Sequence, residues 1–350
     1  MAPFVKARET QQLPSLPDGT AVFQANIDVD WSVFSKPHGG ALLAVILDAT
    51  SRLQQNSQPH HPDPAHIMSH FLTGTLPGEA FVHIKVVRQG KSWTNLYAEL
   101  KQKDEVRITA QLLYTRMPDT PTTNPHPPFG DANLNLFPSS DSVFAKSCPF
   151  LTHPANCTVG QGLTDERGRR WSKDSVFNFV PSYVEWAEDL KVRKRRLESS
   201  SRKERELEWA AWIQFKGEDK VDQGSIGFFT DMMSSLPELF PDGQRVSPHY
   251  YPTLAMSVQF HARLPVTAPY LSSEKTIGCY GRGGPLVSEG RHEQLVEVWT
   301  APGPIGKGEV QDQWKRRCLP LATSTQLALT VPAGKIWKNL GQGDAAKTKL

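Results

Sequence analysis

The chain has 350 residues, of which 38% are hydrophobic and 21% charged, a composition that supports a sizeable core and argues against wholesale disorder. The formal net charge of +3 is too close to balance to indicate a nucleic-acid partner. A chain of this length suits two domains of ordinary size.

The cysteines and the two chain ends bear on the cellular compartment. Four widely spaced cysteines form no Cys-x-x-Cys pair, which argues against a thiolate metal site and favours a reducing compartment. The first ten residues lack the apolar region of a signal peptide, and no stretch reaches the ~18 apolar residues of a membrane span. We therefore expect a soluble, cytoplasmic protein without membrane contact. The terminal Thr348-Lys349-Leu350 resembles a relaxed form of the peroxisomal Ser-Lys-Leu signal, so a peroxisomal location is the alternative.

The first half reads as a strand, a buried helix and then several strands. Residues 19–30 predict a short strand, and the run that follows two glycines, 41–53, is apolar on nearly every side, which indicates a helix buried all round. After a loop rich in proline and histidine, residues 66–117 are rich in β-branched and aromatic residues. They predict three or four antiparallel strands joined by tight turns. One helix packed on such a sheet is an α+β arrangement.

The second half repeats this order after a proline-rich linker at 118–145. A strand is predicted at 209–217 and an apolar helix at 225–240, and four strand candidates follow up to residue 331. The charged insertion 190–205 predicts a solvated loop or surface helix between two strands, with a phosphate-binding patch as the alternative.

Matching segments occur in the same order in both halves, as expected for a duplicated module. The run VILDATSRL at 45–53 matches FFTDMMSSL at 228–236, which aligns Asp48 with Asp231. The run ITAQLLYT at 108–115 matches TSTQLALT at 323–330, which aligns Gln111 with Gln326. We interpret the chain as two copies of one helix-plus-strands unit.

Each predicted helix contains a carboxylate among apolar residues, which is costly unless the group is paired or used. Burial raises the pKa of a carboxyl group in general, and such groups make good general bases. One isolated case would more simply cap a loop. Because Asp48 and Asp231 stand at matching positions, we consider both as candidates for chemistry.

Familiar catalytic and cofactor motifs are absent from the sequence. There is no Gly-x-Ser-x-Gly elbow, which argues against an α/β-hydrolase thioesterase. There is also no Gly-x-Gly-x-x-Gly, Walker or His-Glu-x-x-His motif. We therefore expect neither a metal nor a cofactor.

The second half resembles the C-terminal module of double-hotdog acyl-CoA thioesterases, the family of bacterial acyl-CoA thioesterase II, through FFTDMMSSLP, TLAMSVQFH and PLATSTQ. The first half resembles the N-terminal module through HGGALLA, FLTGTLPGEAFVHIKVVRQGKSWT and ITAQLLYT. The resemblance covers residues 20–117 and 205–331. It implies an α+β fold of two tandem hotdogs, each a long central helix wrapped by an antiparallel sheet. The expected organisation is an N-terminal module at 1–117, the linker 118–145, a C-terminal module at 146–335 that contains the charged insertion, and a polar tail at 336–350.

The resemblance also implies a set of site residues. In that family an Asp, a Thr and a Gln orient one water molecule for attack on the thioester, and these roles pass to Asp231, Thr253 and Gln326. The backbone N–H groups of Gly39 and Gly40, at the start of the first helix, are candidate oxyanion and substrate donors, unless these glycines serve only a tight turn.

The first half has an incomplete version of this set. It keeps Asp48 and Gln111 but has Pro64 at the position of the Thr. We read Asp48 and Gln111 as a degenerate or supporting site, and a second working site is the alternative.

The resemblance implies hydrolysis of acyl-CoA or carrier-bound acyl thioesters, as part of fatty acid and lipid metabolism. One alternative is a hotdog hydratase or dehydratase, which pairs a His with an Asp, and His38 is the only histidine near a predicted helix start. Another is a non-catalytic acyl-binding protein. A homo-oligomer formed through the hotdog sheets is a further possibility.

Overall fold

The computed structural model describes residues 3–33, 36–117, 146–161, 183–198, 207–239, 249–264, 273–286 and 288–332. The predicted linker at 118–145, the predicted polar tail at 336–350 and its terminal tripeptide lie outside the described residues. Within the part of the chain described, no helix is long and apolar enough to cross a membrane.

A single twelve-stranded sheet joins the two halves of the chain, and all pairings along it are antiparallel. The strands of the first half lie in the order β1-β2-β6-β7-β8-β5. Their bounds are β1 Thr10–Leu13, β2 Ala21–Ile27, β5 Asp63–Phe71, β6 Gly78–Gln89, β7 Thr94–Gln102 and β8 Glu105–Thr115. The strands of the second half continue in the order β12-β15-β14-β13-β10-β9. Their bounds are β9 Val184–Glu188, β10 Glu208–Phe215, β12 Thr253–Phe260, β13 Thr276–Leu286, β14 Arg291–Thr300 and β15 Pro320–Leu329.

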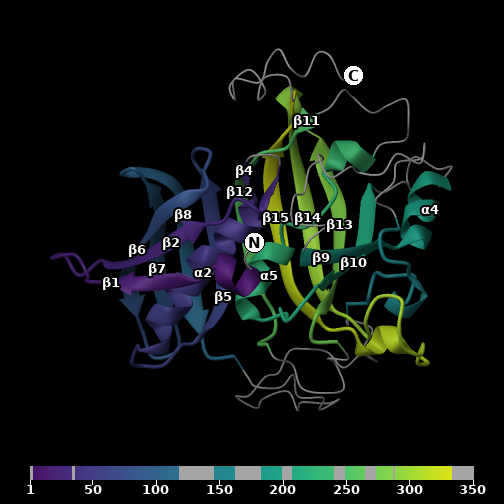
Figure 1. The fold of residues 1–350 in the computed structure, drawn as a ribbon, viewed down its shortest axis with the longest axis horizontal. Coiled ribbons are helices and arrows are strands. Elements are labelled where there is room, and N and C mark those ends of the chain that lie inside the picture. Colours follow the sequence, from purple (N-terminus) through teal and green to yellow (C-terminus); the bar gives the residue numbers. More distant parts are fainter. Residues whose placement is uncertain are drawn as a thin grey trace.

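The strand order is symmetric about the pair β5 and β12. Moving outward from this pair, β8 corresponds to β15, β7 to β14 and β6 to β13. Figure 1 shows the purple-to-blue half and the green-to-yellow half side by side, with α2 (Gly39–Gln55) and α5 (Gln223–Phe229) near the centre. The observed pairing therefore supports the predicted internal repeat.

Shorter elements complete the described structure. Two small ladders pair β3 with β4 and β11 with β16. These elements are β3 Ser32–Val33, β4 Lys36–Pro37, β11 His249–Tyr250 and β16 Val331–Pro332. The remaining helices are α1 Phe4–Ala7, α4 Leu190–Glu198 and the 3₁₀ turns Pro154–Asn156, Leu236–Leu239, Ser288–Gly290 and Trp314–Arg317.

Local sequence explains the regular hairpins of the first half. Lys103 and Asp104 have φ values of 51° and 62°, the left-handed pair that a tight two-residue hairpin requires. Side chains along β7 alternate between buried and half-buried, as expected for a strand with one face on the core. Tight turns of this kind are what the sequence predicts between the strands of the first half.

The two central helices differ in length. Helix α2 spans 17 residues and buries Leu43, Ile46 and Leu47 completely. Helix α5 spans only seven residues, so the prediction of a long helix over 225–240 is wrong for the second half. The Thr230 hydroxyl donates to the Gly227 carbonyl (2.8 Å), and this competition with the backbone coincides with the end of the helix.

Helices α2 and α5 pack directly against each other through small residues. A Cβ atom at Gly227 would lie 2.7 Å from the Leu47 side chain and 3.6 Å from the Ala44 nitrogen. A Cβ atom at Gly40 would lie 2.6 Å from the Phe228 carbonyl oxygen. Glycine is therefore required for this close approach. The contacts run antiparallel, so the C-terminal end of α5 meets the N-terminal end of α2.

The second half buries side chains on both faces of its sheet. Along β10, Trp209, Ala211 and Ile213 face the core shared with α5, whereas Ala210 and Trp212 face a second cluster. In that cluster Phe150 stacks on Trp212 with ring centroids 4.0 Å apart. Helix α4, from the charged insertion, also packs there through Val192.

The described part of the charged insertion is a helix whose arginines form ion pairs within the protein. Arg195 binds the Glu208 carboxylate (2.5 Å) and Arg193 lies 3.3 Å from Glu188. These pairs agree with the prediction of a surface helix inserted between two strands, here β9 and β10. Residues 199–205 lie outside the described residues.

Candidate active site

The carboxylate of Asp231 lies just beyond the end of α5. Helix α5, which leads to Asp231, begins at a capping box. In this box Asp222 accepts from the Ser225 N–H (2.8 Å), and the Ser225 hydroxyl accepts from the Asp222 N–H (2.9 Å). The Asp231 N–H donates to the Phe228 carbonyl (3.2 Å), which continues the turn past the helix end. The Asp231 side chain is 10% exposed, so it is nearly buried but still reaches solvent.

Two strong donors hold this carboxylate from opposite halves of the chain. The Gly40 backbone N–H donates to Asp231 Oδ2 (2.7 Å), and the Gln326 side-chain N–H donates to Asp231 Oδ1 (2.6 Å). The first donor belongs to the start of α2, where unpaired N–H groups and the helix dipole favour negative charge. The second donor comes from the middle of β15.

Both predicted glycines lie against Asp231. A Cβ atom at Gly39 would be 2.8 Å from Asp231 Oδ2, and one at Gly40 would be 2.8 Å from Asp231 Cβ. Any larger residue would displace the carboxylate. The sequence predicts Gly40 as an oxyanion donor, whereas in the structure its N–H is bonded to Asp231. The Gly40 N–H thus positions the carboxylate in this state of the protein.

Thr253 lies on the same inner face of the sheet as Gln326. A β-bulge at Leu254 makes Thr253 face Ala328 and Met256 face Gln326. Paired residues of an antiparallel sheet share a face, and both Ala328 and Gln326 are buried. The bulge thus places Thr253 on the face of the sheet that carries Gln326.

His38 and Tyr250 also lie near the carboxylate, although neither belongs to the predicted Asp, Thr and Gln set. His38 Nε2 is 3.4 Å from Asp231 Oδ2, and the imidazole ring packs edge-on against Phe228. Burial lowers the pKa of His38, and the Asp231 charge opposes this effect, so the ring is neutral at neutral pH. Burial and the charge of Asp231 both raise the pKa of Tyr250, so its phenol stays protonated. The position of His38 directly before the two glycines indicates in the sequence that it lies near the site. The sequence around Tyr250 offers no such indication.

The structure does not bring the predicted first-half set together. Asp48 Oδ2 accepts the Thr10 N–H (2.9 Å), the Thr10 hydroxyl (2.7 Å) and the Arg52 Nε–H (2.7 Å). Gln111 is exposed between the buried Ala110 and Leu112, so it points to the outer face of the sheet, away from the core. Asp48 is therefore held by Thr10 and Arg52, and Gln111 lies on the opposite face of the sheet.

Among the described residues, no group of three or more His, Cys, Asp or Glu side chains could hold a metal ion. The Asp231 carboxylate accepts from a backbone amide and a side-chain amide, and the His38 imidazole lies 3.4 Å from it. Such an arrangement can fix a carboxylate and leave it one lone pair for a water molecule.

Solved structures of low sequence identity have the same fold. A putative thioesterase II from Thermobifida fusca is 16% identical with a TM-score of 0.63, covering 94% of this chain and 98% of that one. A hot dog fold protein from Alicyclobacillus acidocaldarius is 15% identical with a TM-score of 0.62, covering 93% and 97%. An acyl-CoA thioesterase II from Mycobacterium marinum is 12% identical with a TM-score of 0.59, covering 95% and 99%. The chain thus has a hotdog fold.

A curated relative and two family models match parts of the sequence. The relative, ustilagic acid biosynthesis cluster protein orf2 of Mycosarcoma maydis, is 38% identical over 97 residues, which make up 27% of this chain and 24% of that protein. The chain thus matches about a quarter of the length of this relative. The acyl-CoA thioesterase N-terminal domain model matches residues 27–115, and the C-terminal domain model matches residues 161–308. These two models together account for more than half of the sequence, in the order that the internal repeat predicts, and the chain belongs to the acyl-CoA thioesterase family.

Proposed function

We propose that this protein hydrolyses acyl-CoA thioesters with a water molecule held by Asp231, Thr253 and Gln326. The observation that carries the proposal is the carboxylate of Asp231, nearly buried and fixed by donors from α2 and β15. A thioester carbonyl is electrophilic enough for attack by a positioned water with a carboxylate base, so no Ser or Cys nucleophile is needed.

The hydrogen bonds leave room for that water. A carboxylate offers about four lone-pair sites, and Gly40, Gln326 and His38 face three of them. Because an ionised carboxylate only accepts, Gln326 must turn its amide nitrogen to Asp231, which leaves its Oε1 as an acceptor. The water would donate one proton to Asp231 Oδ1 and the other to Gln326 Oε1, and the Thr253 hydroxyl on the same face would fix its oxygen.

The proposed reaction balances as a simple hydrolysis. The water oxygen forms a bond to the thioester carbon while Asp231 accepts a proton from that water. The tetrahedral oxyanion then collapses, the C–S bond breaks, and the thiolate of coenzyme A takes the proton from Asp231. The remaining N–H groups at the start of α2, including that of Gly39, are the donors that we assign to the oxyanion.

We further propose that the two halves are tandem hotdog modules, 1–117 and 146–335, with the site at their joint. The symmetric strand order and the contact between α2 and α5 support this assignment. Asp231 and Gln326 come from the second module, whereas Gly39, Gly40 and His38 come from the first, so neither half alone would complete the site.

A second candidate function is hydration or dehydration of an acyl thioester, because His38 and Asp231 form the His and Asp pair that this chemistry requires. The buried His38 ring faces Asp231 and Phe228, which leaves the carboxylate with its amide donors as the better-exposed group. A thioesterase mechanism therefore accounts for more of the observed contacts of Asp231 than a dehydratase mechanism does.

The test is thiol release from a panel of acyl-CoAs, of short to long chain, together with acyl thioesters of a carrier protein. We expect release from at least one acyl-CoA, loss of that release in Asp231→Ala, and a lower kcat in Thr253→Val. Alkene formation from a 3-hydroxyacyl-CoA without thiol release would favour the dehydratase. Saturable binding without either product would favour an acyl-binding protein, and unchanged turnover in Asp231→Ala would remove the site assignment.

A further inference from the structure

The first half contains a structural counterpart of every element that builds the Asp231 site. Strand β5 has a β-bulge between Pro64 and His66, as β12 has between Thr253 and Ala255. Superposing the two bulges in register makes Pro64 the counterpart of Thr253. Three residues further along, Ile67 pairs with Leu112, as Met256 pairs with Gln326. The counterpart of Gln326 is therefore Leu112 and not Gln111.

The counterpart site cannot position a water. Proline and leucine replace the Thr and the Gln, and neither has a polar side-chain atom. Tyr114 pairs with Pro64, so it corresponds to the small Ala328 that faces Thr253. Its fully buried phenol lies 2.8 Å from the Thr50 hydroxyl and 3.1 Å from that of Ser51. Of the proposed catalytic set, only Asp48 remains on this side.

The N-terminal segment, residues 3–13, covers that remaining carboxylate. Thr10 donates its N–H and its hydroxyl to Asp48, as Gly40 donates its N–H to Asp231. Arg8 binds Asp222, the N-cap of α5, and its guanidinium lies against Gly224 so closely that no side chain would fit there. The Asp231 carboxylate lies against the start of α2. At the start of α5 the corresponding position is taken by Arg8 of the N-terminal segment.

The same segment is anchored in the central core. The Phe4 N–H donates to Asp219 (2.7 Å), and the Phe4 ring packs within 4.7 Å of Trp31 and 4.8 Å of Phe228, centroid to centroid. Phe4 is buried, so its removal would expose the contact between the halves. The N-terminal segment is thus held in place near its start by Phe4 and further along the chain by Thr10.

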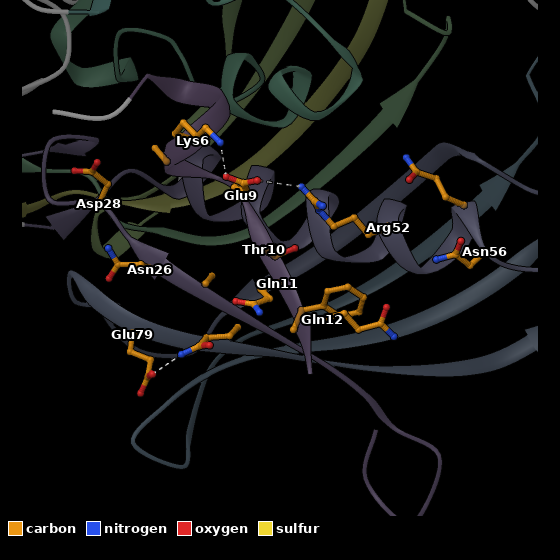
Figure 2. Close-up of a pocket in the computed structure, with 15 residues that line it drawn as sticks. Lys6, Glu9, Thr10, Gln11, Gln12, Asn26, Asp28, Arg52, Asn56 and Glu79 are labelled. Atoms are coloured by element: carbon orange, nitrogen blue, oxygen red, sulfur yellow. Dashed lines mark hydrogen bonds and ion pairs between the residues drawn. The ribbon is translucent and has the colours of Figure 1, made fainter. Parts of the chain in front are cut away.

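A polar hollow of about 830 Å³ remains beside this segment. Figure 2 shows its walls, with Glu9 between Lys6 and Arg52, and with Thr10, Gln12 and Asn56 around it. Sites for apolar ligands are lined mainly by hydrophobic and aromatic side chains. The amide and charged groups around this hollow therefore do not suit an acyl chain.

We infer that the N-terminal segment, residues 3–13, is the permanent occupant of the counterpart site, with Thr10 on Asp48 and Arg8 on the start of α5. The inference rests on the proposed function only in taking the Asp231 site as the working one. Each chain would then take one acyl-CoA, and Asp48 would serve to hold this segment.

The experiment has two parts, and the first does not depend on activity. Amide hydrogen exchange over residues 9–13 should be slow in the native chain and on the order of tenfold faster or more in Asp48→Ala, because that change removes the acceptor that the Thr10 N–H and hydroxyl share. Gln111→Ala, on the outer face, is the matched control and should leave the exchange unchanged. Fast exchange in the native chain, or no response to Asp48→Ala, would overturn the inference.

The second part counts sites with a non-hydrolysable S-decyl thioether of coenzyme A in titration calorimetry. One equivalent per chain supports the inference, and two equivalents contradict it. If the thioether does not bind and no acyl-CoA is cleaved, the proposed function fails, while the exchange over residues 9–13 still decides the inference.

Discussion

Gln326 donates its side-chain N–H to Asp231 Oδ1 over 2.6 Å and so connects the middle of β15 to the turn that follows α5. The pair is 95 residues apart in sequence. On its other oxygen Asp231 accepts the Gly40 N–H from the opposite half of the chain. The carboxylate is therefore the point at which the second helix, the central sheet and the first helix meet, and its position depends on all three.

Replacement of Gln326 by alanine should lower kcat/KM by about 100-fold, because the carboxylate and the water would lose their positioning contact. The matched control is Gln111→Ala, which changes the residue that the sequence aligns with Gln326 but that lies exposed on the outer face. Steady-state thiol release measures both variants. An equal effect of the two changes would show that the hydrogen bond to Asp231 has no part in turnover.

Gly40→Ala should destabilise the protein by about 1–3 kcal/mol, because the added Cβ would lie 2.6 Å from the Phe228 carbonyl oxygen and 2.8 Å from Asp231 Cβ. It should also lower activity by displacing the carboxylate. Gly90→Ala is the control, since its Cβ would meet only the Trp93 carbonyl oxygen at an ordinary 3.5 Å. Chemical denaturation measures the free energy of unfolding. A Gly40→Ala protein as stable and active as the parent would refute the close packing of α2 on α5.

His38 should make the protein less stable as the pH falls. Burial lowers its pKa in the folded state, so below about pH 6.5 the unfolded chain binds the proton more readily than the folded one. The free energy of unfolding therefore falls as the pH drops from about 6.5 toward the lowered pKa. Burial also lowers the pKa of His66, His261 and His292, so only a comparison isolates His38.

In His38→Asn the decrease of Tm between pH 7.5 and pH 5.5 should be smaller than in the parent protein. His60→Asn, which changes an exposed histidine, should leave the decrease as it is. Thermal unfolding across this pH range measures both. A steeper decrease in His38→Asn would mean that the ring is charged and bound to Asp231 in the folded state.

Phe4→Ala should cost about 3–5 kcal/mol of stability, as expected for a large aromatic side chain lost from a packed core. The neighbouring Val5 is 49% exposed, and Val5→Ala should change the free energy of unfolding by no more than about 0.5 kcal/mol. Denaturant titration of the two variants compares adjacent positions of one helix. Similar, small changes would show that the N-terminal segment contributes little to the core.

The sequence predicted the repeat because Asp48 and Asp231 occupy the same position within two similar apolar runs, one in each half. It aligned Gln111 with Gln326 incorrectly, because side chains alternate between the faces of a strand and a shift of one residue moves every side chain to the opposite face. The bulges at Leu254 and before His66, which set that register, have no distinctive residue in the sequence.

Two further features could not be predicted from the sequence. The helix of the second half ends at Phe229, although the apolar pattern continues to residue 240, because tertiary contacts override local propensity. The role of the N-terminal segment, residues 3–13, is not predicted from the sequence. Its helix, α1, has four residues, too few for any periodicity, and its importance lies in distant contacts of Phe4, Arg8 and Thr10.

The central claim is that Asp231, and not its counterpart Asp48, activates the water. Asp231→Asn and Asp48→Asn make the same chemical change at the two corresponding positions, so thiol release from one acyl-CoA compares them directly. We predict that Asp231→Asn lowers kcat by at least about 100-fold while the protein stays folded. We predict that Asp48→Asn keeps its kcat and loses stability instead. An Asp231→Asn protein that retains its turnover, or an Asp48→Asn protein that loses as much of it, would contradict this account.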